Sequence, residues 1–289
     1  MPALDLETPQ GAPRSRLRAS LPSLTAADAK VARFALDEPV RILAMTVTDV
    51  AAATGTSAAT VVRACQSLGY GGYNDLKLAL AREAGETQDL MSGELEPDDP
   101  PAIVLEKVLG ANAAAIRESG EMIDRGEFER AVELIDKAAQ ILVVAVGTSA
   151  PLGQDAAYRL LLLGLRADAP ADIHVQHVSA RSLSEGDLCL AISHTGQTVE
   201  TLACVETARE AGASTAGITS FLRSPLTEQL DVSLVASCQE IGVRLEAMAS
   251  RIAHLSVLDA LCAAVALRRG AAATAALERG YATVAKHRL

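Results

Sequence analysis

The spacing of apolar and polar residues is helical over the first third of the chain. A helix is predicted from about Leu24 to Pro39, because Thr25 and Asp28 have the capping-box spacing that satisfies N–H groups at a helix start. Its apolar face comprises Ala27, Val31, Phe34 and Ala35. This pattern predicts the first helix of an all-α domain.

Two shorter helices separated by a glycine come next. Thr46 and Asp49 repeat the capping-box spacing before a helix predicted over Val47–Thr54, and Gly55 permits the turn that follows it. The apolar face of the following helix comprises Val61, Cys65 and Leu68. A further helix is predicted over Tyr73–Arg82.

The second half of the chain contains short, continuous apolar runs, which are typical of strands that are buried on both faces. These runs are Ile141–Val146, Leu188–Ile192, Thr215–Ile218 and Val232–Val235, with a weaker one near Ala167. The helix-length segments between them are Leu152–Leu163, Thr198–Ala211 and a short one near Pro225–Leu230. The alternation predicts an α/β domain with a parallel sheet that is covered by helices. We expect this sheet to be flavodoxin-like, doubly wound and five-stranded.

These patterns divide the chain into four regions. Residues 1–20 are rich in Pro, Ala, Ser and Arg, and we predict that they form a flexible tail. Residues 21–85 form the helical domain, and residues 86–102 form an acidic linker. Residues 103–289 form the α/β domain with flanking helices, and its core spans about residues 130–268.

Composition narrows the class of protein. The chain is 49% hydrophobic but has no Trp, three Phe and four Tyr, so its core must consist of Ala, Val, Leu and Ile. We find no apolar run of the roughly 18 residues that span a bilayer, and we predict no membrane association. The five cysteines are scattered and form no CxxC pair, which favours a reduced, cytoplasmic protein.

The net charge of −10 is unevenly distributed. The first 85 residues hold nine Lys/Arg and eight Asp/Glu, a balance of +1, whereas residues 86–140 hold five and fourteen, a balance of −9. The total argues against a non-specific nucleic-acid binder. DNA affinity would come from the local field of the helical domain, and would fall with salt.

The two short helices match a helix-turn-helix. Ala51, Gly55 and Val61 fall where that motif needs a small residue, a turn former and a buried aliphatic residue. The second helix would then lie in the major groove of DNA. The candidate DNA-contacting residues are Thr56, Ser57, Ala58, Thr60, Arg63 and Gln66. Arg63 suits a bidentate contact with guanine, worth about 1–3 kcal/mol of discrimination. The alternative is an ordinary three-helix packing module in which Arg63 is only solvated.

Two loops rich in hydroxyl groups follow the first and third predicted strands. The carboxyl ends of these strands flank the switch point of a flavodoxin-like sheet, so both loops should face one crevice. Helix starts supply N–H groups and a partial positive charge, and the hydroxyls add donors. The candidate ligand-binding residues are Gly147, Thr148, Ser149, Ser193, His194, Thr195, Gly196 and Thr198. We predict a phosphate site here.

Each hydroxyl also has a purely structural explanation, because Ser and Thr often cap helices that follow strands. The sequence has no Walker lysine motif and no GxGxxG fingerprint after Val146, so we predict no nucleotide cofactor. His194 has no His, Cys or carboxylate at metal-ligand spacing. We therefore expect a polar loop residue and no metal site.

Together these motifs resemble the RpiR family of bacterial transcriptional regulators, which join an N-terminal helix-turn-helix to a sugar isomerase (SIS) domain. In the helical domain the resemblance rests on Leu24-Thr25, Val31-Ala32, the run from Thr56 to Arg63, Leu68-Gly69-Tyr70 and Leu76-Lys77. In the α/β domain it rests on Gly147-Thr148-Ser149, Gly186-Asp187, Ser193 to Thr198, Gly212-Ala213, Ser224-Pro225-Leu226, Ser250-Arg251-Ile252 and Asp259-Ala260-Leu261.

The resemblance implies DNA contacts from the helix that carries Thr60 and Arg63. The residues that it implies for phosphosugar contacts are Thr148, Ser149, Ser193, Thr195 and Thr198. The chain departs from the family pattern at Ala145, in place of a frequent glycine, at Ala64, in place of a frequent Phe, and at Thr195, in place of a frequent Ser. The first change is expected to narrow the pocket and the second to loosen the core of the helical domain.

The leading hypothesis is a transcription factor that binds operator DNA and responds to a sugar phosphate. Paired DNA-binding domains favour a homodimer or homotetramer. The alternative is an aldose–ketose phosphate isomerase, with Glu246 and His254 as acid–base candidates eight residues apart on one predicted helix, although His254 also suits a packing role. A third hypothesis is a scaffold whose crevice holds no ligand.

Overall fold

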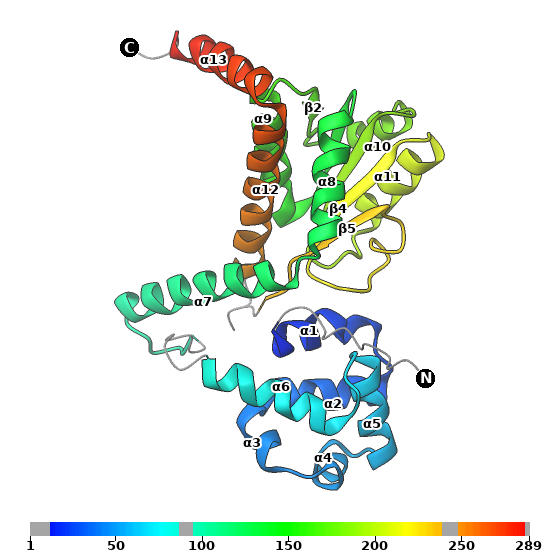
Figure 1. Cartoon of the computed structure of the whole chain (residues 1–289), viewed down its shortest axis with the longest axis vertical. Coiled ribbons are helices and arrows are strands. Elements are labelled where there is room, and N and C mark those ends of the chain that lie inside the picture. Colours follow the sequence, from blue (N-terminus) through cyan, green and yellow to red (C-terminus); the bar gives the residue numbers. More distant parts are fainter. Residues whose placement is uncertain (1–11, 87–94, 239–247, 287–289) are drawn as a thin grey trace, which may run out of the picture.

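The computed structural model of the chain describes residues 12–86, 95–238 and 248–286. Five parallel strands form one sheet in the order β2-β1-β3-β4-β5 (Figure 1). The strands are β1 (Ile141–Val144), β2 (Ala167–Asp168), β3 (Leu188–Ile192), β4 (Ser214–Thr219) and β5 (Val232–Val235). In the register of the sheet, Val144 lies opposite Ala191, and Ile192 lies opposite Ile218. This order confirms the predicted flavodoxin-like sheet.

Helices cover both faces of the sheet, because successive side chains of a strand point to opposite sides. On one face, Ile141 and Leu190 share a core with helices α8 (Arg125–Lys137), α9 (Ala150–Leu162) and α12 (Met248–Arg269). On the other face, Leu142 and Cys189 pack with α10 (Ile173–Arg181) and α11 (Val199–Glu210). Burial on both sides explains why the strands read as continuous apolar runs.

Two more helices flank this domain, α7 (Pro101–Met122) and α13 (Ala271–Ala285). Both contact α12. By length and composition alone, α12 is long and apolar enough to cross a membrane, which our search for apolar runs did not predict. Its buried face includes Val257, Leu258 and Leu261 and belongs to the same core as the sheet. A helix packed in this way fits the core of an α/β domain.

The helical domain has a core of its own. Its elements are α1 (Pro13–Ser20), a 3-10 turn (Leu21–Ser23), α2 (Ala26–Asp37), α3 (Pro39–Ala44), α4 (Val47–Thr54), α5 (Ala58–Ser67) and α6 (Tyr73–Glu86). Leu17, Ile42, Val61 and Leu76 are fully buried in this core. In Figure 1, α1 lies between the rest of this domain and α7, and the two helices are in contact.

The predicted tail is wrong over residues 13–20, which form α1. Pro13 stands in the first turn, where its fixed φ favours a helix and its missing N–H has no partner to lose. Leu17 and Ala19 are fully buried. Two helical turns are too short to show a period, so composition was misleading here. Residues 1–11 lie outside the described residues.

Other differences lie at helix boundaries. Pro39 begins α3 instead of closing the preceding helix, which ends at Asp37. Helix α10 was not predicted, although Asp172 caps it by accepting hydrogen bonds from two N–H groups of its first turn. The segment near Pro225–Leu230 is a turn, because the Ser224 hydroxyl binds the backbone within it. Within the predicted linker, residues 87–94 lie outside the described residues.

Candidate anion site and DNA interface

The loop after β1 contains Gly147, Thr148 and Ser149, which form one 3-10 turn before α9. Gly147 has a φ of +59°, a left-handed conformation that residues with a Cβ rarely adopt. A Cβ built at this position would meet no described atom within 4 Å. The turn therefore needs glycine for its backbone conformation, not for lack of space, and Thr148 beside it is exposed.

The loop after β3 has more hydrogen bonds. The N–H of Ser193 donates to the carbonyl of Ile218 (3.1 Å), and its Oγ accepts from the N–H of Gly196 (3.2 Å). The same Oγ shares a hydrogen bond with Thr198 Oγ1 (3.2 Å). Gly196 has a φ of +62°, and a Cβ there would lie 2.3 Å from Ser224 Oγ and 2.7 Å from Ser224 Cβ. Both conformation and space therefore require glycine at this position.

The hydroxyls of these loops do not cap the helices that follow them. Ser149 and Thr198 occupy the N-cap positions of α9 and α11, yet in the described structure neither side chain accepts a hydrogen bond from the first turn. Thr195 Oγ1 accepts from the N–H of Gln197, inside the loop itself. The start of α11 thus lacks the side-chain partner that a cap supplies, whereas at the start of α9 Ala150 donates its N–H to the carbonyl of Gly147 and Pro151 has no N–H. The capping explanation offered by the sequence does not apply to Ser149 and Thr198.

The two loops leave the sheet at the same edge, because β1 and β3 are hydrogen-bonded parallel neighbours. Helix α9 packs on one face and α11 on the other, so the gap between β1 and β3 is the topological switch point of the sheet. The predicted pocket formed by both loops stays a prediction, which this arrangement supports.

A hydrogen-bonded chain of side chains supports His194. Its Nδ1 lies 2.9 Å from Ser220 Oγ, and the same hydroxyl lies 3.0 Å from His254 Nε2. Burial, with a smaller contribution from His194, lowers the pKa of His254 to about 3, while a hydrogen bond with the backbone of Ala236 opposes this shift. His254 is therefore neutral near pH 7 and suits a packing role better than acid–base catalysis. Glu246, its predicted partner, lies outside the described residues.

Sequence reasoning missed Ser220, and it noted Ser224 only as part of the motif Ser224-Pro225-Leu226, without a place in the site. Ser220 directly follows β4 and so stands at the same edge of the sheet as the two loops. That position was its only signal, because the residue belongs to no cluster of glycine and hydroxyl residues. Ser224 occupies the space that a side chain at position 196 would need.

Two departures from the family pattern are buried. A Cβ built on Gly153 of α9 would lie 3.2 Å from the Cβ of Ala145, so the methyl group of Ala145 points to that helix. Ala64 is fully buried in the core of the helical domain. The glycine in α9 thus makes room for the alanine that follows β1.

Helices α4 and α5 form the predicted helix-turn-helix. Gly55 ends α4 in the left-handed conformation (φ +64°), and Ser57 Oγ caps α5 by accepting from the N–H of Thr60 (3.1 Å). Ala51 and Val61 are buried, as the motif requires. Among the candidate DNA-contacting residues, Ser57, Arg63 and Gln66 are exposed, and Thr56, Ala58 and Thr60 are partly buried.

An ion pair orients the side chain of Arg63. Its Nη2 lies 3.6 Å from Asp28 Oδ1, and the Arg63 side chain is 61% exposed whereas that of Asp28 is 5% exposed. The other oxygen of Asp28 accepts a hydrogen bond from Thr25 Oγ1 (2.8 Å). A buried carboxylate therefore holds one side of the guanidinium group while most of the arginine faces solvent.

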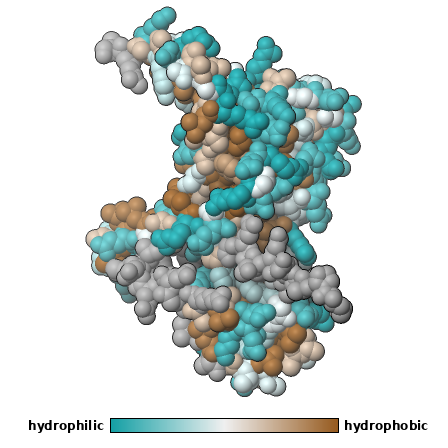
Figure 2. All heavy atoms as spheres, in the orientation of Figure 1, coloured by the Kyte–Doolittle hydropathy of each residue, from teal (hydrophilic) through white to brown (hydrophobic). Residues whose placement is uncertain are grey.

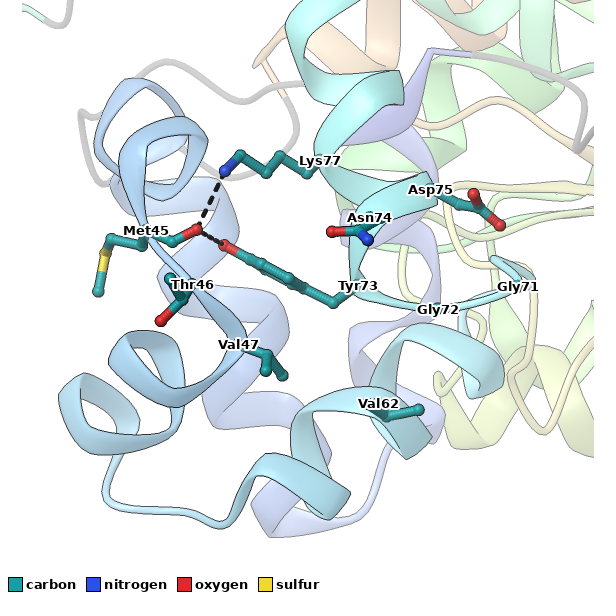
Figure 3. A pocket seen from close by; sticks show the side chains of 10 residues that line it. All are labelled: Met45, Thr46, Val47, Val62, Gly71, Gly72, Tyr73, Asn74, Asp75 and Lys77. Atoms are coloured by element: carbon teal, nitrogen blue, oxygen red, sulfur yellow. Dashed lines mark hydrogen bonds between the residues drawn. The ribbon is translucent and has the colours of Figure 1, made fainter.

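A cleft of about 580 Å³ lies beside α5 (Figure 3). It is lined by Met45, Thr46, Val47, Val62, Gly71, Gly72, Tyr73, Asn74, Asp75 and Lys77. The hydroxyl of Tyr73 (3.0 Å) and the ammonium group of Lys77 (3.1 Å) both donate to the carbonyl of Met45. These bonds tie the start of α6 to the segment before α4, so the walls of the cleft are fixed next to the exposed face of α5.

Two family models match the chain. The helix-turn-helix domain of the rpiR family matches residues 14–87, and the SIS domain matches residues 133–264. The first match covers α1 to α6, and the second covers the whole sheet with most of the helices around it.

Relatives cover both domains. An HTH-type transcriptional regulator of Caldanaerobacter subterraneus is 32% identical over 86% of this chain and 88% of its own. The HTH-type transcriptional regulator HexR of Pseudomonas aeruginosa is 32% identical over 88% of this chain and 89% of its own. The solved structure of Vibrio vulnificus NanR complexed with ManNAc-6P matches 95% of this chain and 98% of that one, with 28% identity and a TM-score of 0.60.

Proposed function

Because the chain belongs to the rpiR family of helix-turn-helix transcriptional regulators with a SIS domain, we propose that a sugar phosphate binds at the carboxyl edge of its sheet and changes the affinity of α5 for operator DNA. The observation that carries the proposal is the pair of helix starts at the switch point, α9 and α11, neither of which is capped by a described side chain.

A phosphate group matches the chemistry of this edge. Its oxygens would accept hydrogen bonds from the first N–H groups of α11, while α9 contributes mainly its dipole, because Ala150 donates its N–H to the carbonyl of Gly147 and Pro151 has none. The two helix dipoles together supply about one elementary positive charge. Hydroxyls of Thr148, Ser193 and Thr198 add donors at the same place. Charge-assisted hydrogen bonds of this kind need no lysine.

The sugar is expected to be a hexose or an N-acetylhexosamine. This class is suggested by the NanR structure, which is similar to this chain over both domains and contains ManNAc-6P. His194 is partly exposed on the loop after β3, so its ring would be within reach of the sugar.

A thermal-shift screen with glucose 6-phosphate, fructose 6-phosphate and ManNAc-6P tests effector binding. A ligand at 100 times its Kd adds about 2.7 kcal/mol to stability. Ser193→Ala should weaken the response about tenfold or more, because it removes both a donor and the acceptor for the Gly196 N–H. Gel shifts without sugar phosphate should be unchanged, and an equal loss of DNA binding would contradict the assignment.

On the DNA side, we propose that α5 enters the major groove and that Arg63 contacts guanine. Arg63→Ala should then cost about 1–3 kcal/mol at one base position, in a duplex selected from a random pool by the wild-type chain. Arg63→Lys should restore phosphate attraction but not the base preference. A uniform loss across all sequences would mean that Arg63 contacts only the backbone.

We further propose that the chain works as a homodimer or homotetramer. Leu105, Leu109 and Ile116 are exposed large apolar residues of α7, and Figure 2 shows hydrophobic atoms gathered at the outer end of this helix. Leu105 and Leu109 lie one turn apart and so share a helix face. Light scattering on a Leu105→Asp/Leu109→Asp variant should show loss of an even-numbered assembly.

The proposal assigns no catalysis to the chain. His254, the one described acid–base candidate, is fully buried and neutral. Turnover of the same three sugar phosphates by purified protein would contradict this part of the proposal.

A further inference from the structure

A continuous series of contacts links the Ser193 loop to the helical domain. It begins at His194, whose ring bonds to Ser220 Oγ and lies 5.7 Å from the ring of Phe221. The next residue, Leu222, donates its N–H to the carbonyl of Ala19 in α1 (3.0 Å). Three consecutive residues after β4 therefore contact a candidate ligand residue on one side and the helical domain on the other.

Helix α1 is fixed to the α/β domain by side chains as well. Ala19 is fully buried against Met122 of α7 and Val235 of β5. Ser15 Oγ donates to Glu118 Oε2 (2.6 Å), and Arg18 is paired with the same carboxylate (3.7 Å). A change in the loop after β4 would therefore act on a helix that already rests on α7.

The same helix also contacts the end of the DNA-reading helix. Arg16 donates from Nη2 to the carbonyl of Leu68 (2.9 Å), the C-cap residue of α5, and its guanidinium lies 5.5 Å from the ring centre of Tyr70. Arg14 is paired with Glu83 of α6 (3.3 Å). Movement of α1 would thus reach the end of α5 through this charge-assisted hydrogen bond, in addition to the packing of α1 on α2 and α6.

Ser220 is placed so that it passes motion on. His254 is fully buried and neutral, and its hydrogen bond with the backbone of Ala236 fixes its ring. Ser220 Oγ therefore bonds on one side to a buried ring and on the other to His194, a partly exposed loop residue. A ligand that reoriented His194 would therefore act on the segment after β4, because Ser220 and Phe221 both contact the His194 ring.

We propose that Ser220, Phe221 and Leu222, here called the coupling segment, transmit effector occupancy from the Ser193 loop to α1, and through Arg16 to the C-terminal end of α5. This inference rests on the proposed function and assigns a route within one chain to its regulation. The competing explanation is that α1 rests on the α/β domain as a fixed support that no effector alters.

The experiment compares two substitutions at one residue. Leu222→Pro removes the N–H that binds Ala19, and Leu222→Ala keeps it while removing the partly exposed side chain. Operator affinity of the full chain is measured by fluorescence anisotropy on a duplex selected by the wild type. The probe is whichever of glucose 6-phosphate, fructose 6-phosphate and ManNAc-6P gives the largest thermal shift.

The wild-type chain is expected to change its operator Kd by about 5–150-fold with the probe. Leu222→Pro should reduce this factor to about 1–2 while the probe still raises its melting temperature, and Leu222→Ala should keep the factor within about twofold of wild type. If Leu222→Pro does not fold, Arg16→Met decides the question, because it breaks the link at Leu68 and keeps an unbranched side chain over Tyr70. In the double variant the loss should not exceed that of either single one, as two links of one route are not additive.

Amide hydrogen exchange of the wild type distinguishes the two explanations, because the exchange rates of α1 would not change with the probe if α1 were a fixed support. The probe should change exchange in α1 and in the coupling segment, whereas unchanged exchange there would overturn the inference. A wild-type response that Leu222→Pro retains in full would overturn the inference alone. A wild-type chain that responds to none of the three sugar phosphates would overturn both the proposed function and this inference.

Discussion

The loop after β1 and the loop after β3 contain the same kinds of residue, but they are built differently. The first has a glycine that faces open space and an exposed threonine, Thr148. The second has Gly196 pressed against Ser224, and Ser193 bonded to both Gly196 and Thr198. Similar sequence motifs therefore give one open loop and one loop fixed by its neighbours.

This difference suggests that the two loops have different roles at the proposed effector site. An open loop can adapt to different sugars, because few contacts have to be broken. A fixed loop can pass a change on, because packed and hydrogen-bonded elements shift between discrete arrangements and do not deform gradually. His194 lies on the fixed loop, and its partner Ser220 begins the coupling segment.

The largest effect is expected from alanine at the two glycines. Gly196→Ala should lower the free energy of unfolding by about 3 kcal/mol, because its Cβ would overlap Ser224 and its φ is positive. Gly147→Ala meets only the φ penalty and should cost about 1 kcal/mol. Urea unfolding of both variants measures the difference, and equal costs would mean that the two loops are equally constrained.

Much of the fold was predictable from the sequence, because it depends on local patterns. The strands buried on both faces read as apolar runs, and β3 and β5 were predicted to the residue. Gly55 and the capping box at Thr46 marked α4 and the turn that follows it, whereas the sequence left the cap of α5 open between Thr56 and Ser57, and the structure has Ser57. Helix α1 was missed because its two turns are too short to show a period, and because two of the helices that it packs on, α6 and α7, lie far away along the chain.

The candidate site was only half predictable for the same reason. Clusters of glycine and hydroxyl residues revealed both loops, since each cluster follows a strand. The network of His194, Ser220 and His254 joins three distant segments, and no spacing along the chain indicates it. The ion pair between Asp28 and Arg63 likewise depends on how α2 and α5 pack.

A smaller effect is expected when the pH is lowered. It should reduce the free energy of unfolding through His254, which lies behind the fixed loop. The folded-state pKa of His254 is lowered to about 3 by burial, whereas in the unfolded chain it is near 6.5. Below about pH 6.5 the unfolded chain binds a proton that the folded chain excludes, so stability is complete above this pH and is lost as the pH falls. Between pH 7.5 and 5.5 this amounts to about 1.4 kcal/mol.

The measurement is urea unfolding of wild type and His254→Gln at both pH values. The difference in stability between the two proteins should shift by about 1.4 kcal/mol in favour of the variant at pH 5.5. An unchanged difference would show that His254 is already accessible to protons in the folded chain, and that the support behind Ser220 is not rigid.

The smallest effect is expected at Thr148, on the open loop. Its side chain is exposed, so its hydrogen bond to a phosphate oxygen would compete with water and contribute about 1 kcal/mol, which is about a fivefold change in Kd. Thr148→Ala should therefore weaken binding of the sugar phosphate by this factor. The ratio of operator affinities with and without saturating sugar phosphate should stay at the wild-type value, because the substitution leaves the route through Ser220 intact. Calorimetric titration gives the first quantity and anisotropy the second. If the ratio collapsed as well, the open loop would also carry the signal, and the two loops would act as one unit.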